Sequence, residues 1–335
     1  MKTLTLLAVL SCPVLAAAQA DPSYPFPLPL GMKTPDVPED NPLTKAKVEL
    51  GKLLYFDKRL SRDNTVSCAT CNDPKNGWTD QDPVSTGIKG QKGGRSAPTV
   101  LNSAYSEVQF WDGRAPSLEE QAKGPIQNPI EMGFTHDEAV ARLSGIKGYA
   151  PLFKAAFGDP KVDIDRVAKA IAGFERTVVT GNAPFDRHEA GTKGALKPAA
   201  ERGMALYFGK ANCSVCHSGP SFTDSQFHNL GVGMSAEKPD LGRHDQTKAD
   251  ADKGAFKTPT LRNLKDTAPY MHDGSQKTLE EVVAFYNKGG EKNANLSKDM
   301  RPLHLSDEEQ RDLLAFLDAL NGDPVSVAEP KSFPQ

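Results

Sequence analysis

The sequence predicts a mostly α-helical protein built from two helical domains. Apolar residues recur at helical spacing in many segments, whereas the alternation that is typical of strands is scarce. The chain has 335 residues, a length that favours two domains of ordinary size. The phrase Gly51-Lys-Leu-Leu-Tyr-Phe56 returns as Gly203-Met-Ala-Leu-Tyr-Phe208, which indicates that one structural unit has been duplicated.

The predicted elements follow in chain order. Residues 21–44 are rich in proline and are expected to form an extended arm. Helical patterns then begin near Thr44 and recur at 117–124, 136–145, 149–157 and 163–180. Gly181-Asn-Ala-Pro184 breaks the last of them, and a boundary near 190–198 separates an N-terminal domain, residues 21–192, from a C-terminal domain, residues 193–335. The second domain is expected to contain a long loop through 220–255 and helices near 278–288 and 306–320.

The first 20 residues are predicted to be a secretory signal peptide. Lys2 precedes an apolar run from Leu4 to Leu15, and Ala18-Gln19-Ala20 offers a cleavage site. The apolar run is too short to span a bilayer, and no other segment approaches that length, so we expect no membrane span and a soluble, periplasmic protein. A lipoprotein anchored through Cys12 is an alternative, because Val9-Leu10-Ser11-Cys12 loosely resembles a lipobox.

Charge argues against a nucleic-acid-binding protein. The 40 basic residues are balanced by 43 acidic ones, so no basic surface for a nucleic acid is predicted. The 38% of hydrophobic residues is modest, and the 26 prolines and 28 glycines imply many loops. Large buried cofactors could therefore supply apolar core that the side chains do not.

Two cysteine pairs carry the strongest chemical signal. Cys213-Ser-Val-Cys216-His217 has the C-x-x-C-H pattern of a c-type haem attachment site. Its cysteines can form thioethers with one porphyrin, and His217 can supply a nitrogen to the iron. Cys68-Ala-Thr-Cys71-Asn72 repeats both cysteines but has asparagine at the ligand position. The sequence therefore predicts two haem c groups, one of which lacks its expected ligand.

Pairs of cysteines also serve purposes other than haem attachment. Once the signal peptide is removed, all the remaining cysteines belong to the two pairs. Disulfides are the ordinary use of cysteine in an oxidising compartment. A shared four-cysteine zinc site and a thioredoxin-like redox pair are further alternatives. His217 favours haem, and no thioredoxin-like βαβ pattern surrounds either pair.

With these motifs in view, the chain resembles the bacterial di-haem cytochrome c peroxidase family, which includes the MauG-type enzymes. The similarity spans roughly residues 40–320 and lies in segments of matching order and spacing, namely Ser67–Cys71, Pro83–Gly87, Ser96–Asn102, Gln109–Arg114, Glu120–Pro125, Asn128–Met132, Cys213–His217, Phe256–Asn263 and Thr267–Gly274. The resemblance implies two cytochrome-c-like domains, each around a covalently attached haem c.

The resemblance assigns an electron relay to the C-terminal haem and peroxide chemistry to the N-terminal haem. His217 resembles the proximal ligand of the relay haem. The family's distal position falls on Tyr286, and tyrosine there is similar to the MauG branch. Met271 is the alternative distal ligand by spacing, together with Met300, and a methionine would raise the haem's potential.

The same resemblance places residues between and above the haems. Glu131 and Gln121 resemble the distal residues that move a proton and orient peroxide. Trp111 corresponds to a tryptophan between the two haems. The family also binds calcium nearby, and the match places its ligands at Ser96, Thr267 and Pro269.

Two positions depart from the family pattern. Ile88 occupies the position of a distal histidine that closes the peroxidatic haem at rest, so we expect this site to be open without prior reduction. Asn72 replaces the proximal histidine of the same haem. An amide is a far poorer donor than imidazole, so Asn72 is expected to lower or abolish turnover, and the sequence leaves the loading of this haem open.

The sequence therefore predicts a periplasmic di-haem cytochrome c peroxidase, impaired by Asn72. It would reduce hydrogen peroxide to water with electrons from a small cytochrome c or a cupredoxin. A MauG-like enzyme that oxidises residues of a partner protein is the first alternative, and a single-haem electron carrier is the second. The resemblance also implies that the chain can form a homodimer.

Overall fold

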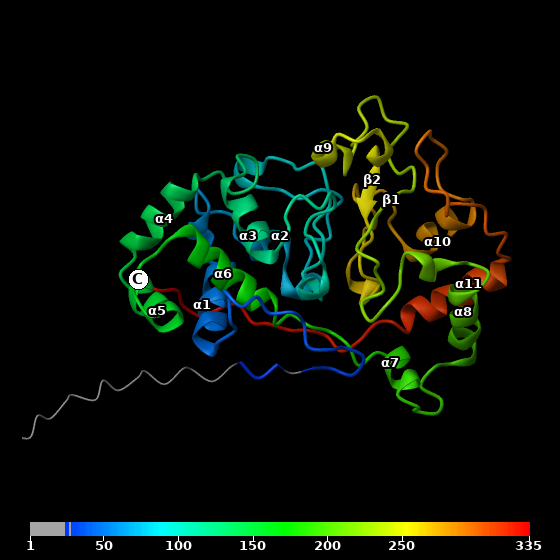
Figure 1. The fold of residues 1–335 in the computed structure, drawn as a ribbon, viewed down its shortest axis with the longest axis horizontal. Coiled ribbons are helices and arrows are strands. Elements are labelled where there is room, and N and C mark those ends of the chain that lie inside the picture. Colours follow the sequence, from blue (N-terminus) through cyan, green and yellow to red (C-terminus); the bar gives the residue numbers. More distant parts are fainter. Residues whose placement is uncertain (1–23, 27) are drawn as a thin grey trace, which may run out of the picture.

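The structure, a computed structural model, describes residues 24–26 and 28–335 and confirms the mostly α-helical fold (Figure 1). Its α-helices are α1 (Lys45–Phe56), α2 (Cys68–Cys71), α3 (Leu118–Gln127), α4 (His136–Gly145), α5 (Tyr149–Phe157), α6 (Ile164–Glu175), α7 (Pro184–Glu189), α8 (Pro198–Phe208), α9 (His244–Thr247), α10 (Leu279–Asn287) and α11 (Asp307–Asp318). In this part of the chain no helix has the length and apolarity that a membrane crossing requires. The predicted signal peptide, residues 1–20, and the lipobox at Cys12 lie outside the described residues.

Side-chain caps explain where the predicted helices begin. The side chains of six residues accept a hydrogen bond from a backbone N–H in the first turn of the following helix, namely Thr44, Ser117, Thr135, Asp163, Thr278 and Ser306. Helix α6 ends at Glu175, earlier than the pattern through residue 180 predicted. The reason is a tertiary contact, because Asn102 bonds the backbone of Val178 and of Thr180 and draws this segment out of the helix.

Two crossed helix pairs form the cores of the two halves. Helix α1 crosses α6 at Gly51, where a Cβ atom would lie 1.8 Å from the carbonyl oxygen of Ala170. Helix α8 crosses α11 at Gly203, where a Cβ atom would lie 1.9 Å from the carbonyl oxygen of Asp312. Only glycine permits such close backbone contact. The repeated phrase in the sequence therefore marks two equivalent helix crossings.

A small antiparallel sheet lies between the two halves. Strand β1 (Phe227–Asn229) pairs with β2 (Ala255–Lys257), so that Phe227 faces Lys257 and Asn229 faces Ala255. Figure 1 shows the sheet beside α10, on the side of the second half that faces the first. Strands of three residues are too short to show an alternating pattern, and the sequence predicted only a loop here.

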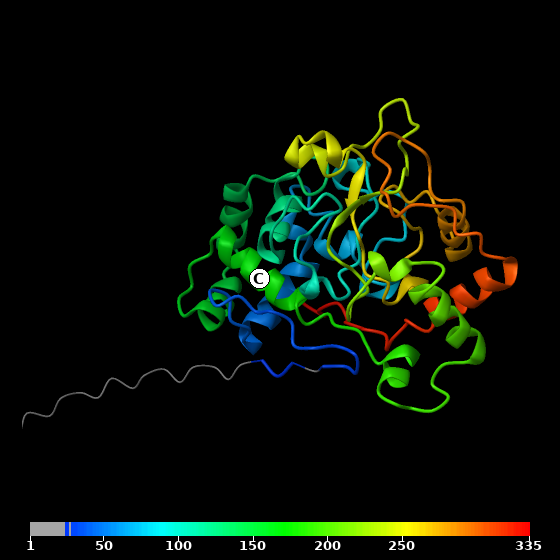
Figure 2. The same ribbon diagram turned by 45° about the vertical axis from the view of Figure 1, so that its right-hand side comes forward.

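The C-terminal tail returns to the first half of the molecule. The sequence placed this tail in the second domain, but Val325, Val327 and Phe333 pack against the core of the first. The indole N–H of Trp78 donates to the carbonyl of Val325 at 2.9 Å. Figure 2 shows the tail, in red, running from α11 back to the first half of the molecule, where the chain ends. It therefore ties the two halves together.

Candidate functional site

The C-terminal cysteine pair presents a histidine in the form that binds iron. Cys213 and Cys216 lie in a turn that follows α8, and His217 comes next. The Nδ1 atom of His217 lies 3.0 Å from the carbonyl oxygen of Phe222. Burial lowers the pKa of this imidazole, so the ring is held neutral with its proton on Nδ1. The Nε2 lone pair is therefore available to a metal.

A cavity adjoins this pair and collects the candidate distal ligands. Cys213, Cys216 and His217 line it, and so do Tyr286, Met271 and Met300. Burial raises the pKa of Tyr286, and within residues 24–26 and 28–335 its hydroxyl has no hydrogen-bond partner. Its free hydroxyl is what an iron ligand at this position requires. The assignment of Tyr286, with Met271 as the alternative, stays a prediction.

The N-terminal pair repeats the same local geometry. The hydroxyl of Tyr55 donates to the carbonyl oxygen of Asn72, as Tyr207 donates to that of His217. The amide nitrogen of Asn72 donates to Trp78 and Pro98 carbonyls at 3.2 and 2.9 Å. Asn72 therefore occupies the position equivalent to His217. The cysteines fit a covalently attached haem, but this position offers no imidazole nitrogen.

The thiols do not support the alternative uses of the cysteines. All four are free, and each pair lies beside a different core. The pairs therefore cannot share one zinc ion. Burial raises the pKa of Cys71 to about 11 and that of Cys213 to about 12, whereas reactive redox pairs have lowered values.

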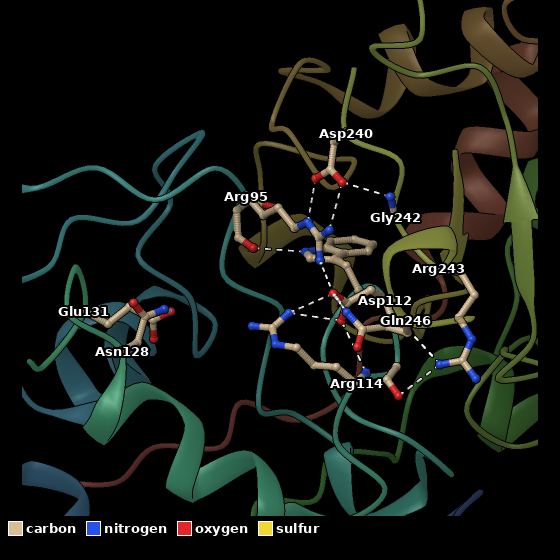
Figure 3. A network of polar contacts seen from close by, with 12 residues as sticks. Arg95, Asp112, Arg114, Asn128, Glu131, Asp240, Gly242, Arg243 and Gln246 are labelled. Carbon is tan, nitrogen blue, oxygen red and sulfur yellow. Dashed lines mark hydrogen bonds and ion pairs between the residues drawn. The ribbon is translucent and has the colours of Figure 1, made fainter. Parts of the chain in front are cut away.

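Glu131 lies beside the N-terminal pair. Burial raises the pKa of both Cys68 and Cys71, and the negative charge of Glu131 adds a smaller contribution at each thiol. The amide of Asn128 donates to Oε1 of Glu131 at 2.6 Å. Burial raises the pKa of Glu131, and the nearby charge of Arg114 opposes that shift. Figure 3 shows the Arg114 guanidinium pointing towards Glu131.

The other residues predicted for the N-terminal, peroxidatic site are only partly brought together. Ile88 is buried in the first core, and its N–H donates to the carbonyl of Glu131 at 2.9 Å. Gln121 lies on α3, but within the described part of the chain no hydrogen bond joins its side chain to Glu131. The roles of Gln121 and Glu131 in peroxide chemistry stay predictions.

Trp111 and the predicted calcium residues meet between the halves. The indole N–H of Trp111 donates to the carbonyl of Ser96 at 2.9 Å, and both residues line the same cavity as Thr267 and Pro269. The hydroxyl of Ser96 donates to the carbonyl of Met271. The three predicted calcium ligands therefore line one cavity. Calcium binding stays a prediction.

An ion-pair network, which the sequence did not predict, joins the halves at this point. Arg95 bonds Asp112 at 2.8 Å and Asp240 at 2.6 and 2.8 Å, and Arg114 also bonds Asp112 (Figure 3). Asp112 is almost fully buried. Because Asp240 comes from the loop before β2, Arg95 fixes the segment near Trp111 against the second half.

Glu175 is a second feature that sequence reasoning missed. This residue ends α6, is buried, and has an Oε2 atom without a hydrogen-bond partner. The two helix crossings have matching aromatic contacts. Phe174 packs on Tyr55 in the first, and Phe316 packs on Tyr207 in the second. Glu175, the residue after Phe174, is therefore equivalent to Leu317. Leu317 lines the C-terminal cavity. Aligning the two repeats beyond the cysteine motifs would have revealed the acid.

The fold and the two cysteine units define a helical protein with two cytochrome-c-like halves. Residues 45–194 match the di-haem cytochrome c peroxidase family, and residues 200–321 match the cytochrome c family. The cytochrome c match implies that the chain binds haem c. The chain belongs to the di-haem cytochrome c peroxidase family.

Relatives within this family have two kinds of name. The methylamine utilization protein MauG of Methylorubrum extorquens is 45% identical over 97% of this chain and 93% of its own length. The cytochrome c551 peroxidase of Nitrosomonas europaea is 43% identical over 84% of this chain and 82% of its own. A solved MauG-like protein associated with microbial copper homeostasis is 34% identical, with a TM-score of 0.82 over 90% of this chain and 96% of its own.

Proposed function

We propose that this chain is a di-haem enzyme that reduces hydrogen peroxide to water with electrons from a small redox protein, and that Asn72 lowers its turnover. The half-buried carboxyl of Glu131, whose charge acts on both Cys68 and Cys71, carries the proposal. A peroxidatic site needs an acid–base group at this place, and a purely electron-carrying domain does not.

The C-terminal half would serve as the entry point for electrons. Cys213 and Cys216 would hold a haem c, and His217 would bind its iron through Nε2. When bound, haem c supplies one-electron redox chemistry that side chains lack. Trp111 lies between this cavity and the first half, so its indole provides an aromatic path towards the N-terminal site.

Glu131 is suited to hold and release a proton. Asn128 occupies Oε1, which leaves Oε2 as the atom that can carry the proton. Burial favours the neutral acid, and the positive charge of Arg114 keeps ionisation within reach. A carboxyl in this balance can take a proton from peroxide and return it to the leaving oxygen.

The test compares the chain with its Asn72→His variant. We expect the variant to hold two haems per chain, measured by intact mass and pyridine haemochrome absorbance, and to reduce peroxide at least tenfold faster with a reduced small cytochrome c. Asn76→His is the matched control, because it adds a histidine to the same loop away from the ligand position. Equal turnover in the chain, the variant and the control would refute the proposed role of Asn72.

Haem content separates the peroxidase from a single-haem carrier. A chain that still holds one haem after Asn72→His, with normal redox cycling and no peroxide reaction, would be a single-haem electron carrier on a peroxidase scaffold.

A MauG-like enzyme that oxidises residues of a partner protein is the second candidate. The free hydroxyl of Tyr286 in the cavity favours it, since tyrosine here is the MauG-type pattern. Magnetic circular dichroism distinguishes the candidates. A methionine-ligated C-terminal haem would remove the support for this reading.

A further inference from the structure

Lys257 carries a half-buried positive charge that nothing in the proposed function uses. It ends β2, and its backbone N–H donates to the carbonyl of Trp111 at 2.8 Å. Its side chain lines the cavity together with Cys213, Cys216 and His217. Burial lowers the pKa of this ammonium to about 8. Lys257 is thus half-buried and lines the cavity.

The ammonium has no partner among the side chains that the structure describes. Neither an ion pair nor a side-chain hydrogen bond is formed by Lys257 in residues 24–26 and 28–335. Asp224 is the nearby carboxylate that favours its charge, but Asp224 lies 2.8 Å from Nε2 of His228 and is engaged there. A partly desolvated charge without a partner is unfavourable, so the ammonium of Lys257 would gain from an anion bound in the cavity.

The cofactor of this cavity would bring that anion. A haem c attached at Cys213 and Cys216 carries two propionate carboxylates in addition to its apolar ring. We propose that the Nζ atom of Lys257 binds a propionate carboxylate of the haem held by Cys213, Cys216 and His217. This inference rests on the proposed function in that it requires a haem c at the C-terminal pair.

The ion pair would tune the relay haem as well as hold it. Ferric haem carries one more positive charge than ferrous haem, so a lysine charge nearby favours the ferrous state and raises the potential. Replacing the lysine leaves an unpaired negative propionate, which favours the ferric state. The backbone N–H of Lys257 bonds the carbonyl of Trp111, so this lysine would act next to the residue proposed to lead electrons to the first half.

The test measures the midpoint potential of the C-terminal haem in Lys257→Met by spectroelectrochemistry, at about pH 7.5, where propionates are ionised. We expect the ferrous-to-ferric equilibrium to shift at least tenfold towards ferric haem, which is about 59 mV for one electron. The resonance Raman band of propionate bending should shift as well. Lys253→Met is the matched control, because Lys253 lies on the same segment but pairs with Asp250 at the surface.

Further variants keep the outcome decisive. Lys257→Arg retains the charge and should keep the potential near that of the unaltered chain, and Lys257→Gln replaces Lys257→Met if the latter does not fold. An unchanged potential and an unchanged propionate band in the charge-removing variant would overturn the inference. Haem content distinguishes the two failures, because absence of haem from the C-terminal pair refutes the proposed function, whereas a loaded haem that ignores Lys257 refutes this inference alone.

Discussion

Replacing Glu175 with glutamine is expected to remove a loss of stability that the protein otherwise suffers as pH rises. The carboxyl is buried, and its Oε2 atom has no partner. The adjacent Arg176 is bound by Glu119 at 2.6 and 3.0 Å. Burial therefore raises the pKa of Glu175 from 4.5 to about 8. Between pH 4.5 and about 8, the folded protein therefore keeps the proton on Glu175, whereas the unfolded chain has lost it.

The sign and size of the effect follow from this difference. Between the two pKa values the folded state binds more protons, so the free energy of unfolding falls as pH rises. Each pH unit in this window costs about 1.4 kcal/mol. Raising the pH from about 5.5 to 7.0 should therefore remove roughly 2 kcal/mol from the unaltered chain, and Glu175→Gln should not show this loss.

Guanidinium unfolding at these two pH values measures the effect. The quantity to compare is the pH-dependent change in the free energy of unfolding, in the unaltered chain and in Glu175→Gln. Glu107→Gln is the matched control. Because Glu107 is exposed, this substitution should not alter the pH dependence of the free energy of unfolding. The reasoning fails if Glu175→Gln retains the full pH dependence, since the carboxyl would then be ionised or paired in the folded protein.

Three further changes test other parts of the structure. In the Asn72→His background, Glu131→Gln should lower peroxide turnover at least a hundredfold, measured in the steady state, because an amide cannot return a proton. In that background the fully ferric protein should react with peroxide in a stopped-flow mixing experiment. Ile88→His should slow that reaction, because it places at position 88 the distal histidine that closes the peroxidatic haem in the family. Arg262→Met should cost about 3–5 kcal/mol in chemical unfolding, because Asp186 would be left as a buried, unpaired charge.

Local signals allowed the sequence to predict α1, α3, α4, α5, α6, α10, α11 and both cysteine units, whereas the short helices α7 and α9 were not predicted. Helical periodicity was sufficient there, and the caps at Thr44, Ser117 and Thr278 explain where three of these helices begin. The duplicated phrase correctly indicated a repeated unit, because Gly51 and Gly203 make the same close helix crossing.

Contacts between distant segments could not be predicted. Strands β1 and β2 pair across a long loop, and the tail crosses to the first core through Val325 and Phe333. The unpaired states of Lys257 and Glu175 are also long-range properties, since they depend on which charges fail to come near. The local sequence pattern does not indicate whether a charged side chain will find a partner in the folded protein.

Asn72 lies in a scaffold that matches the one around His217. Tyr55 still donates to the carbonyl of residue 72, and the amide of Asn72 still bonds Trp78, which is the counterpart of Phe222. Trp78 and Phe222 both have left-handed backbone conformations, with φ of 61° and 51°. The loop is thus already shaped for an imidazole that bonds residue 78 and directs its other nitrogen to a metal. For this reason Asn72→His should restore the ligand without rebuilding the fold, and unfolding curves of the haem-free proteins should nearly coincide.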